Sequence, residues 1–178
     1  MRIGSGVAAA LALLIGLPAG AAAQDLATRG DWRDLGHDVA LTYAWDLGAQ
    51  RASGPDWIVR MMSSPLHPGG GVEYTILEVR ISCAARTYVI VRGQEFAADG
   101  RPVTSVQPSA EGSGGRDAMR PVDGTPAGVF LPFVCGEMDP PASQPPQEAA
   151  EMASAARGYV LSGTAEWERR GRPPRYRP

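Results

Sequence analysis

A single pair of cysteines, Cys83 and Cys135, sets the strongest constraint on how this chain can fold. Two thiols in an oxidising compartment most often pair. The bond would close a loop of about 53 residues and stabilise the fold by roughly 4 kcal/mol in the chain-entropy model. The alternative is a redox pair, but such pairs usually have the spacing C-x-x-C. The sequence therefore favours a structural disulfide.

The start of the chain indicates the compartment. Arg2 precedes an apolar run over residues 7–17, and Ala21-Ala22-Ala23 supply small residues before Gln24. This is the order of a secretory signal peptide, and the apolar run is shorter than the roughly 20 residues that span a bilayer. We expect residues 1–23 to be removed and the protein to be exported, to the periplasm or the cell surface. No cysteine lies at the cleavage site, so a lipid anchor there is not expected.

The length of the remaining chain, residues 24–178, is typical of one domain. Its core is expected to consist mainly of Val, Ile and Leu, because aromatic residues make up only 7% of the chain. The net charge of −2 offers no general attraction for nucleic acid. All 17 basic residues are arginines, which indicates coding bias rather than function. No transmembrane segment is expected after the signal.

Alternation of apolar and polar side chains predicts a strand at 77–83. We expect its even members to face water and its odd members the core, and we expect a β-bulge between Ile76 and Leu77, where the phase of the pattern changes. Further strands are predicted at 39–44, 56–62, 86–95 and 101–106. The expected core residues are Trp57, Leu77, Val79, Ile81, Val89 and Val91.

The second half is predicted to be partly helical. Thr125-Pro126 is a typical helix start, although Pro132 removes a hydrogen bond, so 126–134 is interpreted as a short helix with a buried strand as the alternative. A Pro-rich linker over 139–146 separates the domain, residues 24–138, from a C-terminal packing segment over 147–168. Its helix is expected to end before Gly158, and the Arg/Pro-rich tail, 169–178, to be disordered.

The order of these features resembles the surface-adhesin protein E family of exported Gram-negative bacterial proteins. In that family a Trp opens the domain, as Trp32 does here. A strand ending in a Cys precedes an Arg-aromatic strand, as in Tyr74–Cys83 and Arg86-Thr87-Tyr88, and a second Cys follows a short helix start, as in 125–135. The resemblance covers about residues 31–136. It implies an α+β fold, with an antiparallel sheet of about five or six strands and a helical segment tied to it by the Cys83–Cys135 disulfide.

The type member of that family binds host matrix proteins and plasminogen. This chain lacks lysine, whose side chain plasminogen kringles commonly capture, and it has no cysteine at the cleavage site. We therefore do not carry host binding over to it.

Residues that favour catalysis or metal binding are few. His37 adjoins Asp38, but no serine lies in a G-x-S-x-G elbow, and two histidines, His37 and His67, without further ligand spacing do not make a zinc site. A carboxylate pair of Glu78 and Glu95 is disfavoured, because an outward Glu78 is expected to pair with Arg80 or a cross-strand charge. No catalytic residue, cofactor or metal is predicted.

Two weak interaction candidates remain. Arg29-Gly30-Asp31 spells the tripeptide that integrins recognise on exposed loops, a match that is frequent by chance. The tail arginines Arg169, Arg170 and Arg172 are candidates for weak contact with anionic surfaces, although a solubilising role is favoured. The expected function is a non-catalytic, adhesin-like interaction at the bacterial cell envelope with an unidentified partner. The alternative is a periplasmic accessory or structural protein that binds a partner or a small ligand.

Overall fold

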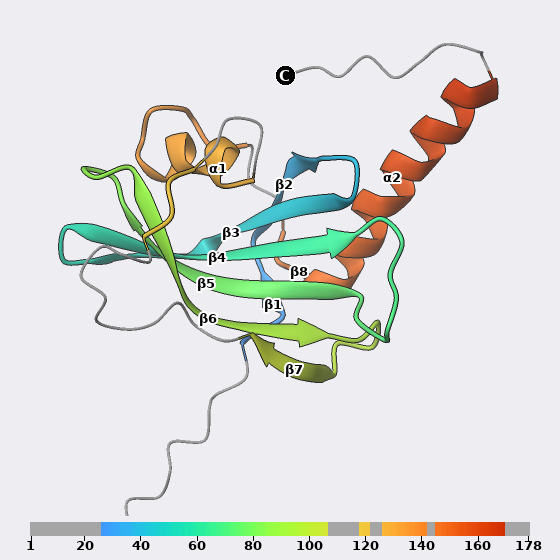
Figure 1. Cartoon of the computed structure of the whole chain (residues 1–178), viewed down its shortest axis with the longest axis horizontal. Helices are drawn as coiled ribbons and strands as arrows, with labels where there is room; N and C mark the ends of the chain where they lie inside the picture. Colours follow the sequence, from blue (N-terminus) through green and yellow to red (C-terminus); the bar gives the residue numbers. More distant parts are fainter. Residues whose placement is uncertain (1–25, 107–117, 122–125, 142–144, 170–178) are drawn as a thin grey trace, which may run out of the picture.

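The computed structural model describes residues 26–106, 118–121, 126–141 and 145–169. The predicted signal peptide, the Gly-rich stretch at 111–116, Arg170 and Arg172 lie outside these residues. The fold is α+β, as predicted (Figure 1). Its elements are β1 (Arg29–Gly30), β2 (Trp32–His37), β3 (Leu41–Ser53), β4 (Asp56–Pro65), β5 (Tyr74–Ser82), β6 (Thr87–Phe96), β7 (Pro102–Val106), α1 (Pro126–Val134), β8 (Gln147–Glu148) and α2 (Ala149–Arg169).

Six strands, β2 to β7, form one antiparallel sheet in which spatial order equals chain order. The two-residue strands β1 and β8 form a separate small ribbon, although 118 positions separate Gly30 from Glu148 in the sequence. Figure 1 shows α1 and α2 against different parts of the sheet, with the far end of α2 extending beyond it.

Two hydrophobic clusters lie on opposite faces of this sheet, because neighbouring residues in a strand point to opposite sides. Ala44 and Met62 pack with the start of α2, whereas Trp45 and Met61 pack with α1. The α2 side also contains Trp32, Tyr74, Ile76 and Phe96, and the α1 side contains Val59, Val79, Ile81 and the helix residues Ala127, Phe130, Leu131 and Val134.

This double coverage corrects two predictions about β5. The strand pairs with β4 without interruption from Trp57↔Ile81 to Ser63↔Thr75, so no bulge lies between Ile76 and Leu77. The change of phase arises because residues up to Ile76 are buried on the α2 side and later ones on the α1 side. Glu78 was expected in water, but its side chain is buried because that face is covered too.

The observed irregularity lies in β6 instead, and it explains a second correction. Glu78 pairs with Arg92 and Val79 with Ile90, so Val91 is the extra residue of the bulge. Val89 and Val91 are only half-buried and belong to neither core cluster, contrary to the prediction. The other four predicted core residues pack in the α1-side cluster, Trp57 and Leu77 being half-buried.

Helix α1 confirms the helical interpretation of 126–134 despite Pro132. Ala127, Phe130, Leu131 and Val134 follow the i, i+3, i+4, i+7 spacing of one helix face, and all four are buried. Gly136 lies just after the helix, and its φ of 72° suits that position. The Cys83–Cys135 disulfide is present, with Cα atoms 5.6 Å apart, and it fixes this end of α1 to the end of β5.

Helix α2 is longer than predicted. It was expected to end before Gly158, but it continues to Arg169, the first of the three tail arginines. Gly158 does not adopt the positive φ that would end a helix, and a Cβ added there would meet nothing within 4 Å. Tyr159 is 76% exposed and Leu161 is 40% exposed, so the packing predicted for 147–168 does not include these two side chains.

Candidate functional site

An apolar pocket of about 390 Å³ lies between α1 and the sheet. Its floor comes from strands β3 to β6, which contribute Tyr43, Met61, Leu77 and Ile90 among others. The pocket lies on the α1 side of the sheet, where the nine-residue helix covers only part of the surface.

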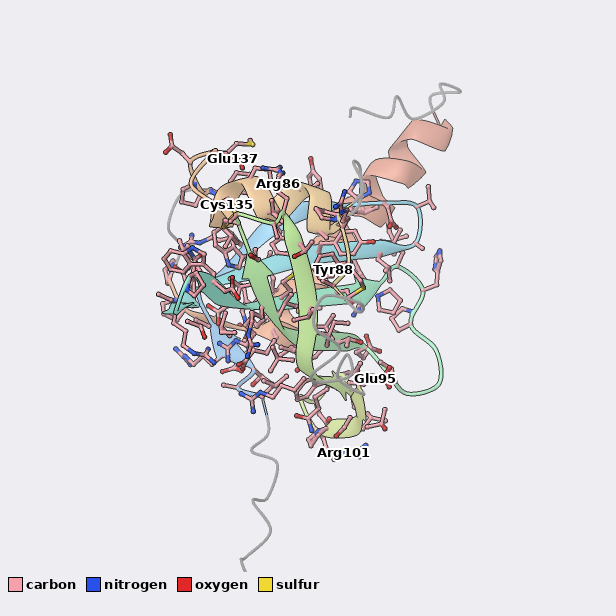
Figure 2. All side chains as sticks on the ribbon, turned by 60° about the vertical axis from the view of Figure 1, so that its left-hand side comes forward. Arg86, Tyr88, Glu95, Arg101, Cys135 and Glu137 are labelled. Carbon is pink, nitrogen blue, oxygen red and sulfur yellow. A yellow bond between two sulfur atoms is a disulfide. The ribbon has the colours of Figure 1, made fainter. Side chains whose placement is uncertain are left out.

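One wall of the pocket belongs to α1. The first turn of the helix contributes Ala127 and the second contributes Phe130, whose ring lies edge-on to Tyr88 with centroids 6.5 Å apart. Figure 2 shows Tyr88 on β6 close to α1. The disulfide holds the opposite end of the helix, and the ion pair between Arg86 and Glu137 lies beside it. The covalent link therefore positions the wall without lying in the pocket.

The other wall is the short segment 118–121. It is held by two backbone hydrogen bonds between Met119 and Tyr88, each 2.9 Å from nitrogen to oxygen. This pairing places the Met119 side chain in the lining and Arg120 at the edge of the pocket, where its side chain is exposed. Burial raises the pKa of the Tyr88 hydroxyl above its ordinary value of 10.0, so the group is neutral at physiological pH with or without this shift.

The pocket has one further polar edge, at Tyr43. Its hydroxyl donates a hydrogen bond to the Asp38 carboxylate, which also accepts from the backbone N–H groups of Ala40 and Leu41 at 2.7 and 2.8 Å. Burial acts to raise the pKa of Asp38, but these hydrogen bonds outweigh it and lower the pKa below its ordinary value. The carboxylate is thus ionised and engaged beside the pocket.

The His37–Asp38 pair does not form a catalytic dyad in the described structure. The His37 ring is exposed and lies 3.1 Å from the backbone oxygen of Asp38, while the Asp38 carboxylate serves Tyr43 and the turn. His67 is exposed in the loop after β4. Among the residues that the structure describes, no group of three or more His, Cys, Asp or Glu side chains is placed to hold a metal ion.

The opposite face of the sheet carries a row of charges across four strands. Asp46, Arg60, Glu78 and Arg92 occupy neighbouring register positions on β3, β4, β5 and β6, with alternating sign. Glu78 accepts from Arg92 at 2.8 Å and from Arg51 at 2.6 Å. Burial acts to raise the pKa of Glu78, but the hydrogen bonds from Arg92 and Arg51 outweigh it and lower the pKa.

Glu78 therefore pairs across strands, as one of the sequence alternatives had it. Glu95 lies on the other face of the sheet, in register with Thr75. The two carboxylates are not brought together.

This row of charges also holds the Arg29-Gly30-Asp31 tripeptide. Arg60 donates to Asp46 and to the backbone oxygens of Ala27 and Arg29, and Asp31 N–H donates to Asp46 at 2.8 Å. A Cβ on Gly30 would lie 2.6 Å from Cγ of Asp46. The tripeptide thus lies in and beside strand β1, packed on the sheet, rather than on an exposed loop.

Sequence reasoning did not find the pocket. Its lining comes from four strands, one helix and a short connecting segment, and the apolar residue types there are also typical of a core. The one sequence signal was the run Tyr88–Val91, apolar on both faces, which indicated a covered strand.

Within the described part of the chain, no helix is both long enough and apolar enough to span a membrane. Comparison of the chain with models of protein families, with curated proteins and with solved structures found no match.

Proposed function

We propose that this protein is an exported, non-catalytic binding domain that holds a small apolar molecule in the pocket between α1 and the sheet. The observation that carries the proposal is the pocket itself, whose volume of about 390 Å³ falls in the range of small-molecule sites. Its lining is dominated by aliphatic and aromatic side chains with few polar groups, which is the usual composition of such sites.

Two further features support export. The first 23 residues have the order of a signal peptide, and Cys83 and Cys135 are joined, as is common outside the reducing cytosol. The disulfide also restrains α1, the element that forms a wall of the pocket. A wall held in place before binding lowers the ordering cost of taking up a ligand.

The test is titration of the purified protein with N-phenyl-1-naphthylamine, a neutral apolar dye that fluoresces when it leaves water. We expect saturable binding of one dye per chain. Ile90→Trp places a large ring in the pocket and should weaken dye binding at least tenfold, while Leu161→Trp, at an exposed position of α2, should leave it unchanged. Circular dichroism establishes that both variants are folded. Absence of saturable binding to the parent protein, or unchanged binding by folded Ile90→Trp, would overturn the proposal.

A second candidate is an adhesin-like role at the cell envelope. It is favoured by the architecture, an antiparallel sheet with α1 tied to it by Cys83–Cys135, which is what the family resemblance implies. Labelling intact cells with a membrane-impermeant reagent tests it. Labelling of the protein supports exposure at the surface, and labelling only after the outer membrane is opened contradicts it.

A further inference from the structure

Arg120 is the one charged residue among the described residues that line the pocket. The other polar members of the lining, Tyr43, Ser63 and Tyr88, are neutral. Arg120 lies at the end of the short segment that Met119 anchors to Tyr88, and its side chain is exposed at the edge rather than buried inside. An apolar interior therefore opens beside one cation.

From this arrangement we infer that the ligand is an anionic single-chain amphiphile, whose alkyl chain fills the pocket and whose carboxylate pairs with Arg120. The inference rests on the proposed function and specifies its ligand class. A guanidinium matches a carboxylate with two parallel hydrogen bonds. A fully apolar ligand would form no ion pair with Arg120, and a cationic amphiphile would be repelled by it.

The negative charge of Asp38, beside the Tyr43 edge of the pocket, determines the orientation of the bound amphiphile. Asp38 is ionised and bonded to Tyr43, so this end repels a carboxylate. The headgroup therefore lies at Arg120 and the alkyl chain runs toward Tyr43 and Leu41. Among the residues that the structure describes, no acidic side chain forms an ion pair with Arg120.

The experiment is displacement of the bound neutral dye by dodecanoate below its critical micelle concentration, by dodecanol below its solubility limit, and by butanoate. We expect dodecanoate to compete at a concentration at least tenfold lower than dodecanol does, which corresponds to about 1.4 kcal/mol. Butanoate should compete poorly because it lacks the alkyl chain. The advantage of the acid over the alcohol should shrink as salt is added, since the carboxylate pairs at an exposed site.

Arg120→Gln should bring dodecanoate to the level of dodecanol and leave the dye and the alcohol unchanged. Its matched control is Arg80→Gln, which removes an exposed arginine from the opposite face of β5. Equal competition by acid and alcohol in the parent protein would overturn this inference while leaving the pocket a binding site. A preference for acid that persists in Arg120→Gln would also overturn it. Failure of the parent protein to bind the dye at all would remove the proposed function instead.

Discussion

The buried hydroxyl of Tyr74 gives the sharpest test of the packing on the α2 side. The side chain is 0% exposed and stacks on Phe96 with ring centroids 5.1 Å apart. Its oxygen has no hydrogen-bond partner among the residues that the structure describes. A buried hydroxyl without a partner costs about 1–3 kcal/mol. Tyr74→Phe removes the oxygen and keeps the stacked ring, so we expect it to stabilise the protein by about 1 kcal/mol at pH 8.

The dependence of the free energy of unfolding on pH above pH 10 gives a second, independent prediction. Burial, assisted by the negative charges of Glu148 and Asp99, raises the pKa of Tyr74 from 10.0 to about 12. A raised pKa means that the folded state holds the proton more tightly than the unfolded state. The stability that the raised pKa of Tyr74 contributes is therefore fully present below pH 10, and it is lost as the pH rises from 10 to about 12. By pH 11 the loss is about 1.4 kcal/mol.

Urea unfolding at pH 8 and pH 11, followed by circular dichroism, measures both effects. The advantage of Tyr74→Phe should grow from about 1 kcal/mol at pH 8 to more than 2 kcal/mol at pH 11. Tyr43→Phe is the matched control, since the Tyr43 hydroxyl is bonded to Asp38 and its removal should cost about 1 kcal/mol. A Tyr74→Phe variant less stable than the parent, or an advantage that does not grow with pH, would refute the reasoning.

Three further changes test other parts of the fold by urea unfolding. Replacing Cys83 and Cys135 together by serine should cost about 4 kcal/mol, because the bond closes a loop across a sequence separation of 52; a cost below about 1 kcal/mol would contradict this. The lowered pKa of Glu78 adds stability that is present above its ordinary value of 4.5 and is lost as pH falls below it. Glu78→Gln should therefore be less stable than the parent at pH 7 and lose less stability between pH 7 and pH 3, and parallel profiles would argue against this. Gly30→Ala should cost about 1–3 kcal/mol by displacing the buried Asp46 carboxylate, whereas Gly48→Ala, whose Cβ would lie 3.3 Å from that of Asp31, should cost less; equal costs would disprove the proposed clash.

The sequence predicted the fold class, the disulfide and helix α1, because each has a local or compositional signal. The apolar spacing favours a helix over these residues, and this effect outweighs the tendency of Pro132 to break a helix. The residues that carry the spacing are Ala127, Phe130, Leu131 and Val134. The two errors on β5 share one cause. The alternation of apolar and polar residues was interpreted as one buried and one solvent-exposed face of the strand. Both faces of β5 are covered, so Glu78 is buried and bonded to Arg51 and Arg92.

The pocket was beyond prediction for a different reason. Strand alternation shows that Leu77 faces away from Glu78, but it does not show where α1 stops covering the sheet. That limit depends on the length of the helix and on where Cys135 fixes it, which are properties of the assembled structure. Arg120, in a chain of 17 basic residues, all of them arginines, has no local sequence feature that points to the role proposed for it.

The pairing of β1 with β8 has a consequence for the order in which the chain assembles. Each strand of the main sheet pairs with its neighbour in sequence, so the meander needs only short loop closures, which are the fastest steps of folding. Residues 29–30 can pair only once residues 147–148, the last strand of the described chain to be synthesised, are present. The N-terminal residues whose backbone groups contact Asp46 and Arg60 therefore gain their strand partner only after the rest of the described chain has been made.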